Sequence, residues 1–222
     1  MTTSNQVQLD TGPAPSWGVI WLHGLGADGH DFEPIVPELC ARTWPAIRFV
    51  FPHAPVRPVT INGGARMRAW YDIKSLDRTA LGEAPGIRES IAAIAEIILA
   101  FGKQGITPDR TFIIGFSQGG ALALSAALRY PEKLAGVVAL SCYLPLAESL
   151  ADEANNANAD IPVFMAHGVQ DPVVPMALGQ LSAQILRARG LSVDWHQYPM
   201  PHSVCAEEIA DLRTWMAARL LG

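Results

Sequence analysis

The sequence has few cysteines, few charges and no long apolar run. Only three of its 222 residues are cysteines, Cys40, Cys142 and Cys205, and they are widely spaced. An odd, scattered set of this kind predicts free, buried thiols in a reducing compartment rather than a disulfide framework. No apolar run approaches the roughly 18 residues of a membrane-spanning helix. Charged residues make up 17% of the chain, the net charge is −5, and no basic cluster occurs, so we expect no nucleic-acid binding.

The first residues show no targeting or lipidation signal. The stretch 1–6 is polar and lacks the basic-then-apolar pattern of a signal peptide. Thr2 stands where N-myristoylation needs a glycine, and no cysteine lies near either end in a lipidation motif. We therefore expect a cytoplasmic protein without a stable membrane anchor.

Apolar strand-like runs alternate with helical patterns along the chain. Half of the 222 residues are hydrophobic, which gives one domain with an ample core. The expected strands are 17–22, 47–51, 111–115, 134–141, 162–167 and 192–198. The expected helices are 32–42, 86–104, 118–130, 176–189 and 204–220. The alternation predicts a single α/β domain, residues 1–222, with a mostly parallel central sheet and helices on both faces.

A serine stands where an expected strand meets an expected helix. The pentapeptide Gly115-Phe116-Ser117-Gln118-Gly119 joins the apolar run 111–114 to the helical run 121–128. This context is that of a nucleophile elbow, whose strained turn projects the serine hydroxyl from the top of a sheet. Small residues are needed two positions before and after the serine, because side chains there would collide with the strand and the helix. The pattern predicts Ser117 as a nucleophile; the alternative is an ordinary strand-to-helix turn.

A serine nucleophile needs a histidine to take its proton, and three histidines follow Ser117. His167 ends an expected strand and precedes the best acid candidate, against the order serine, acid, histidine, so we expect it to be structural. His196 lies inside an alternating strand, too far from the strand's end to act as the base. His202 lies in the loop after that strand, where catalytic groups collect in open α/β sheets. His202 is therefore the predicted base.

Asp171 is the carboxylate predicted to orient this histidine. It follows the expected strand 162–167 across a short loop that contains no second acid. Asp160 lies at the wrong end of the strand, and Asp194 begins the next one. The alternative role for Asp171 is an N-cap of the helix expected at 176–189, which contributes only about 1 kcal/mol.

Two backbone amides are expected to stabilise the oxyanion of a tetrahedral intermediate. One belongs to Gln118, the residue after the predicted nucleophile, and we assign the other to Leu25 in the glycine-rich loop 23–29. The glycines of this loop let the backbone turn its amides inward. His23 and His30 match no common zinc spacing and have no cysteine beside them, so we expect no metal.

The segment 52–85 is long, rich in glycine and proline, and without a strong period. Loops of this length are often functional. Two interpretations stay open: its apolar residues wall an acyl pocket, or it forms a hairpin that turns at Asn62-Gly63 and packs on the core. Trp70 and Tyr71 can serve both purposes, and we expect them to contact substrate. Asp72 is expected to cap or pair locally.

Several motifs together resemble the phospholipase/carboxylesterase family, also called the acyl-protein thioesterase family, and look closest to its small bacterial carboxylesterases. They run in the family's order over nearly the whole chain, so the resemblance is specific. The matching stretches are Trp21-Leu22-His23-Gly24-Leu25-Gly26-Ala27-Asp28-Gly29, Phe51-Pro52-His53-Ala54-Pro55, Ala69-Trp70-Tyr71-Asp72-Ile73, Gly115-Phe116-Ser117-Gln118-Gly119-Gly120, Leu140-Ser141-Cys142-Tyr143-Leu144-Pro145, His167-Gly168-Val169-Gln170-Asp171 and Tyr198-Pro199-Met200-Pro201-His202.

The resemblance implies an α/β-hydrolase fold with Ser117, Asp171 and His202 as a catalytic triad. It also implies an oxyanion hole formed by Leu25 and Gln118, and no cofactor. Members of the family hydrolyse carboxylic esters of short to medium chains, and some cleave thioesters on acylated proteins or lysophospholipids. Several bacterial relatives look dimeric, so a homodimer is expected here.

One position departs from the family's pattern. Pro201 stands where relatives often have glycine before the catalytic histidine. Proline fixes its own φ and disfavours the α region for Met200. The departure bears on the orientation of His202 and not on its presence.

The sequence predicts a serine carboxylesterase that hydrolyses small-molecule esters of short to medium acyl chains through an acyl-enzyme. The alternative within enzymes is an acyl-protein thioesterase or lysophospholipase that acts on long acyl chains, which would need a long apolar groove. An alternative of another class is a non-catalytic, hydrolase-like binding module. Such a module usually lacks a triad residue, whereas all three positions are filled here.

Overall fold

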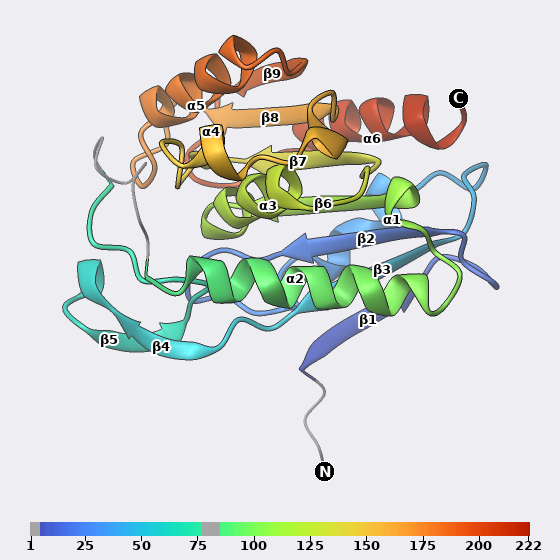
Figure 1. The fold of residues 1–222 in the computed structure, drawn as a ribbon, viewed down its shortest axis with the longest axis horizontal. Coiled ribbons are helices and arrows are strands. Elements are labelled where there is room, and N and C mark those ends of the chain that lie inside the picture. The colour runs from blue at the N-terminus through green and yellow to red at the C-terminus, as the bar shows by residue number, and fades with distance from the viewer. Residues whose placement is uncertain (1–4, 77–84) are drawn as a thin grey trace.

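The computed structural model describes residues 5–76 and 85–222, and in this part of the chain a seven-stranded sheet forms the centre (Figure 1). The strand order is β1-β3-β2-β6-β7-β8-β9. All neighbouring strands are parallel except β1 and β3. The predicted α/β fold with a mostly parallel sheet is thus confirmed. The strands are β1 (Gln6–Asp10), β2 (Trp17–Leu22), β3 (Ile47–Pro52), β6 (Thr111–Phe116), β7 (Gly136–Leu140), β8 (Val163–Gly168) and β9 (Val193–Tyr198).

Helices cover both faces of the sheet (Figure 1). One face packs against α2 (Ile87–Gly102), α3 (Gln118–Arg129) and α5 (Met176–Ala188). The other face packs against α1 (Val36–Leu39) and α6 (Ala206–Leu220). Short elements complete the described chain: α4 (Leu150–Glu153) and the 3-10 turns Glu33–Ile35, Thr60–Asn62, Pro108–Arg110 and Asn156–Asn158.

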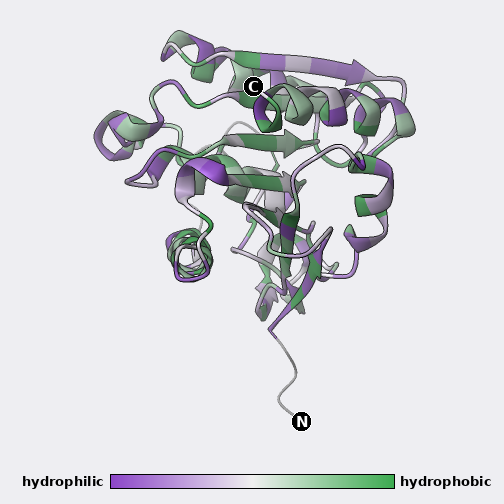
Figure 2. Ribbon diagram, turned by 90° about the vertical axis from the view of Figure 1, so that its right-hand side faces the viewer, coloured by the Kyte–Doolittle hydropathy of each residue, from purple (hydrophilic) through white to green (hydrophobic). Residues whose placement is uncertain are grey.

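The inner strands are apolar on both sides because both faces of the sheet are covered. In β6, Ile113 packs in the layer beneath α2, α3 and α5, and its neighbour Ile114 packs in the layer beneath α1 and α6. Parallel strands buried in this way appear in the sequence as continuous apolar runs, which made them recognisable. Figure 2 shows the same distribution, with hydrophobic colour concentrated on the middle strands.

The predicted strands and four of the five predicted helices lie within two residues of the observed ones. The helix predicted at 32–42 was wrong. The chain forms only a 3-10 turn and the four-residue α1 there. The cause is a pair of prolines, Pro34 and Pro37. In a helix begun at residue 32, Pro37 would fall in the interior and remove a backbone hydrogen bond.

The sequence analysis missed the edge strand β1. Only Val7 and Leu9 are apolar in it, and they pack against the layer of α1 and α6. The strand pairs with β3, so that Val7 faces Phe51 and Asp10 faces Arg48. Its assignment depends on this pairing, because two alternating apolar residues are too short a pattern to indicate a strand.

The segment after β3 forms the hairpin that was one of the two interpretations. Strands β4 (Val56–Val59) and β5 (Ala65–Arg68) pair antiparallel. The turn spans five residues instead of the two predicted, and Gly63 and Gly64 take φ of 65° and 81°. Asp72 pairs locally, as expected, by accepting hydrogen bonds from the Thr60 amide (2.7 Å) and hydroxyl (2.6 Å). Residues 77–84 of the predicted functional segment lie outside the described residues.

The carboxyl ends of β2, β6, β8 and β9 lie along one edge of the sheet, because these strands are parallel. The segments that carry Leu25, Ser117, Asp171 and His202 follow these four strands in turn. The fold therefore gathers all the predicted catalytic segments at one edge. In the described ranges, no helix is both long and apolar enough to cross a membrane.

Candidate active site

The predicted nucleophile occupies a strained turn between β6 and α3. Ser117 has φ 55° and ψ −120°, a region that residues other than glycine rarely adopt. Its amide donates to the Leu140 carbonyl of β7 (2.8 Å), which holds the turn against the sheet. A Cβ on Gly115 would lie 2.2 Å from the Gly119 carbonyl oxygen, and one on Gly119 would lie 2.2 Å from the Leu22 carbonyl oxygen. Both positions must be glycine, as the elbow pattern requires.

The predicted acid lies in a tight loop after β8, with its carboxylate fully buried. Asp171 Oδ1 accepts hydrogen bonds from the amides of Val173 (2.8 Å) and Val174 (2.9 Å). Asp171 Oδ2 accepts from His202 Nδ1 (2.7 Å). The alternative role does not apply, because Pro175 is the N-cap residue of α5. Asp171 instead organises its own loop and presents one oxygen to His202.

The predicted base lies beside the nucleophile's turn. The His202 ring is 4.7 Å from the ring of Phe116, the residue before Ser117. Its side chain is 15% exposed. Pro201 does not turn His202 away from Asp171. Among the described residues the Ser117 hydroxyl has no hydrogen-bond partner; such bonds often form only when substrate is bound.

The loop after β2 lies against the nucleophile and is fixed by a buried histidine. A Cβ on Gly24 would lie 3.6 Å from Ser117 Cβ. His23 Nδ1 donates to the Gly24 carbonyl (2.7 Å), and its Nε2 accepts from the Ala54 amide (3.1 Å). Burial lowers the pKa of His23, which keeps the ring neutral and both bonds intact. His23 is thus an anchor of this loop, which no sequence pattern had indicated.

The two amides assigned to the oxyanion hole are available as donors. The Leu25 amide has no acceptor within the described ranges, whereas the next amide, that of Gly26, donates to the Arg68 carbonyl (2.9 Å). Gln118 is the first residue of α3, so its amide has no acceptor within the helix. The described residues contain no group of three or more His, Cys, Asp or Glu side chains that could hold a metal ion.

Trp70 and Tyr71, the predicted substrate contacts, are held by the side chain of Gln118. Gln118 Oε1 accepts from the Trp70 amide (2.8 Å), and Gln118 Nε2 donates to the Tyr71 carbonyl (2.8 Å). Trp70 Nε1 also donates to the His23 carbonyl (2.9 Å). Both aromatic residues are almost fully buried, 3% and 1% exposed. The residue after the nucleophile therefore ties the loop of Trp70 and Tyr71 to α3, a contact that the sequence analysis did not foresee.

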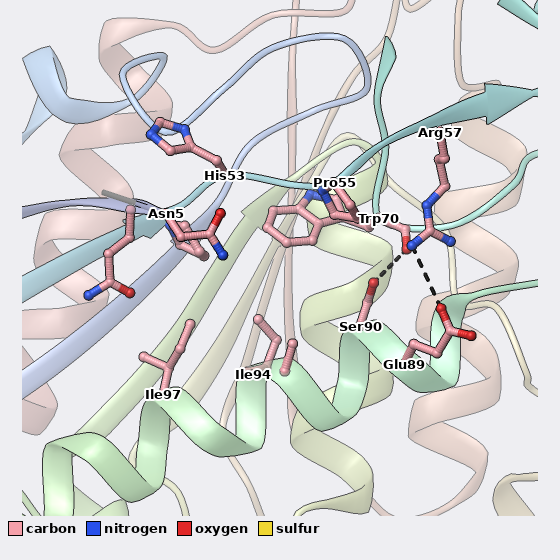
Figure 3. A pocket seen from close by; sticks show the side chains of 12 residues that line it. Asn5, His53, Pro55, Arg57, Trp70, Glu89, Ser90, Ile94 and Ile97 are labelled. Carbon is pink, nitrogen blue, oxygen red and sulfur yellow. Dashed lines mark hydrogen bonds and ion pairs between the residues drawn. The ribbon is translucent and has the colours of Figure 1, made fainter. Parts of the chain in front are cut away.

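The Trp70 ring faces a cavity of about 450 Å³ between α2 and the segment after β3 (Figure 3). Figure 3 shows Ile94 and Ile97 of α2 below this cavity and Arg57 at the end near Glu89. None of Ser117, Asp171 and His202 lines it. Trp70 thus contributes to the loop's anchoring and to a cavity away from the three predicted catalytic residues.

Tyr71 contacts a second, apolar region, which lies next to the loop of Asp171. Its hydroxyl is hydrogen-bonded to that of Tyr143 (3.0 Å), and burial raises the pKa of Tyr143 to about 12, so the pair stays neutral. Tyr143 packs with Val174 and Leu178, and the partly buried Leu76 contacts the same group. A cavity of about 430 Å³ continues along α5 from there. Its lining residues are Leu76, Pro175, Ala177, Leu178, Gln180, Leu181 and Gln184.

The two remaining histidines after Ser117 lie where the sequence placed them. His196 is in the middle of β9, stacked between Phe164 (4.7 Å) and Tyr198 (6.2 Å), away from the strand's end. His167 is in β8 and is fully buried. It contacts the loop of Asp171, which the sequence could have indicated because the two residues are four positions apart.

Comparisons with known proteins identify similar sequences and structures. The family model described as phospholipase/carboxylesterase matches residues 7–220. Acyl-protein thioesterase 1 of Cryptococcus neoformans is 36% identical, with 99% of each chain covered. The crystal structure of a SOBER1 variant from Arabidopsis thaliana has a TM-score of 0.87 at 31% identity, covering 92% of this chain and 99% of that one. The structure of acyl-protein thioesterase 2 from Zea mays has a TM-score of 0.81 at 30% identity, covering 96% and 99%.

Proposed function

This chain belongs to the phospholipase/carboxylesterase family, and we propose that it is a serine hydrolase of the acyl-protein thioesterase type, which cleaves thioesters or esters of medium to long acyl chains. The observation that carries the proposal is the hydrogen bond between Asp171 and His202 beside the strained Ser117. A buried carboxylate, a histidine oriented by it and a serine on an elbow are the three parts of a serine-hydrolase triad.

The proposed reaction proceeds through an acyl-enzyme. His202 Nε2 accepts the proton of Ser117 Oγ as this oxygen bonds to the acyl carbon, and the electron pair of the carbonyl moves onto its oxygen. The amides of Leu25 and Gln118 donate to that oxyanion. The bond to the leaving sulfur or oxygen then breaks, and His202 returns the proton to the leaving group. Water repeats the sequence on the acyl-enzyme and releases the acid, while Asp171 stabilises the imidazolium in each step.

The preference for longer acyl chains rests on two kinds of support. The apolar group of Tyr143, Val174 and Leu178 begins at the Asp171 loop and continues into the cavity along α5. The volume of this cavity, about 430 Å³, falls in the range of small-molecule binding sites. In addition, curated relatives at 36–39% identity are acyl-protein thioesterases. Both favour the thioesterase or lysophospholipase alternative over the short-chain carboxylesterase that was our first interpretation of the sequence.

The test is to measure kcat/KM for p-nitrophenyl esters from acetyl to palmitoyl and for matching acyl thioesters. We expect a maximum at medium to long chains and turnover of thioesters. A maximum at the acetyl ester would instead favour the short-chain carboxylesterase. No turnover and no labelling of Ser117 by a fluorophosphonate would favour the non-catalytic binding module instead.

The Ser117→Ala variant tests the nucleophile itself. Because triad members act as a unit, we expect kcat to fall by about 10⁴-fold or more, with the fold intact by circular dichroism. Ser203→Ala is the matched control, since Ser203 lies next to His202 but outside the elbow. Near-normal turnover by Ser117→Ala would contradict the assignment.

A further inference from the structure

His167 lies next to the catalytic carboxylate, although it is not a member of the triad. It is the next-to-last residue of β8, just before the Asp171 loop, and is fully buried. Its Nε2 is 2.9 Å from the Val174 carbonyl oxygen and 3.4 Å from Asp171 Oδ2. The first distance is that of a good hydrogen bond, and the second is a close approach of a donor to a carboxylate. Two histidines thus contact one oxygen of Asp171.

The proton of His167 is fixed on Nε2. The ring's other nitrogen, Nδ1, is buried without a hydrogen-bond partner and faces α5, where a Cβ on Gly179 would lie 2.6 Å from it. A proton on Nδ1 would therefore have no acceptor. Burial lowers the pKa of His167, so the ring stays neutral and acts as a permanent donor toward Val174 and Asp171.

Val174 joins the two residues through the two peptide groups that flank its Cα atom. Its N–H donates to Asp171 Oδ1 (2.9 Å), and its C=O accepts from His167 Nε2 (2.9 Å). If this carbonyl lost its donor, the backbone on both sides of the Val174 Cα atom would be free to shift, and Asp171 Oδ1 would lose one of its two amide donors. The carboxylate could then turn, and the 2.7 Å bond from His202 to Oδ2 would lengthen.

We propose that His167 is a positioning residue of the active site: it holds the Val174 carbonyl and faces Asp171 Oδ2, and so fixes the carboxylate in the orientation that His202 requires. The inference rests on the proposed function, since it assigns His167 a part in the same triad. It differs from a packing role, because a ring needed only to fill space would not leave a buried nitrogen unpaired.

The experiment compares two substitutions of His167 with one control. His167→Leu removes both nitrogens at similar volume, whereas His167→Gln keeps an amide donor near the position of Nε2. Ser182→Ala is the control, because Ser182 is an equally buried polar residue of α5 that accepts from Leu144 and does not contact Asp171. All three variants and the parent are measured for kcat and KM on the best acyl substrate, for melting temperature, and for the low-field proton signal of the His202–Asp171 hydrogen bond.

We expect His167→Leu to lower kcat about 10- to 100-fold with KM changed less than about twofold, because a small displacement of a catalytic group is enough for such a loss. The low-field signal should disappear in this variant, and His167→Gln should recover most of kcat and the signal. Ser182→Ala should lower the melting temperature while kcat and the signal are retained. If His167→Leu does not fold, His167→Asn replaces it, since its shorter amide does not reach the Val174 carbonyl.

The inference is overturned if the variants without a donor keep the parent's kcat and low-field signal, or if His167→Gln is as impaired as His167→Leu. These results leave the proposed function intact, because the parent's activity and its loss in Ser117→Ala are measured in the same series. A parent protein without hydrolase activity would instead contradict the proposed function.

Discussion

The two halves of the candidate site are held in place by different means. The nucleophile half, around Ser117 and the Leu25 loop, is fixed by backbone packing: Gly115 and Gly119 leave no room for even one carbon atom. The acid–base half, around Asp171 and His202, is fixed by hydrogen bonds between side chains and loop amides. The first half therefore depends on the absence of side chains, and the second on particular polar atoms.

This difference predicts how each half responds to change. Added volume should damage the nucleophile half, since the contacts there are with backbone that cannot move cheaply. Loss of a single polar atom should damage the acid–base half without any change in volume. The two kinds of damage can be tested separately. In the acid–base half the substitution is isosteric and removes a polar atom, whereas in the nucleophile half it adds one carbon atom.

The largest effect is expected in the acid–base half, from Asp171→Asn. The amide is isosteric with the carboxylate, but it cannot stabilise an imidazolium and favours the wrong tautomer of His202. We expect kcat to fall by about 10⁴-fold with the melting temperature changed by little. Asp194→Asn is the matched control, because Asp194 also pairs with a histidine, His196 at 3.0 Å, away from the site. Equal activity of the two variants would contradict the role of Asp171.

Gly119→Ala should break the nucleophile half. Its new Cβ would lie 2.2 Å from the Leu22 carbonyl oxygen and 2.6 Å from that of His23, just before the Leu25 loop. We expect kcat to fall by about 10²- to 10³-fold, as for the loss of one oxyanion donor. Gly102→Ala adds the same atom at the end of α2 with nothing within 4 Å, and should raise stability by about 0.5–1 kcal/mol. Both variants are measured for kcat in activity assays and for the free energy of unfolding by chemical denaturation. An unchanged kcat in Gly119→Ala would refute the packing argument.

Gln118 combines the two means in one residue, since its amide is an assigned oxyanion donor and its side chain holds Trp70 and Tyr71. Gln118→Met keeps the backbone amide but leaves two buried backbone groups without partners. We expect a loss of about 2–4 kcal/mol in the free energy of unfolding, and a larger fall of kcat/KM for long acyl esters than for acetyl esters. Gln104→Met, at an exposed position, is the control. A uniform fall over all chain lengths would mean that Tyr71 does not shape the acyl region.

The sequence indicated the segments that carry the candidate site better than the contacts between them. The elbow and the chain order of Ser117, Asp171 and His202 follow from local patterns, because glycine spacing and strand ends can be recognised in sequence. The side-chain contacts of Gln118 could not be predicted, since its partners, Trp70 and Tyr71, depend on how a distant loop folds back over the sheet. The same reason explains the missed strand β1, whose only strong signal is its pairing with β3.

Glu208 adds a pH dependence to the stability of the whole protein. It lies in the first turn of α6, in the segment after His202, and is fully buried. Burial raises its pKa from the usual 4.5 to about 8, and the Cys205 amide offsets only part of the rise. Between these values the folded protein holds a proton that the unfolded chain releases. Stability should therefore fall as pH rises through this window, by at most about 1.4 kcal/mol per pH unit.

Glu208→Gln removes this proton exchange while it keeps the size of the side chain. Free energies of unfolding measured at pH 5, 6, 7 and 8 should decline more steeply for the parent than for the variant, and the difference should level off above pH 8. Burial lowers the pKa of His23 and His167, which acts in the opposite sense at low pH, but both histidines are present in both proteins and cancel in the difference. Glu207 is the exposed neighbour of Glu208, and the free energy of unfolding of Glu207→Gln should change with pH as it does for the parent. Parallel curves for Glu208→Gln would mean that the carboxylate is already ionised in the folded protein.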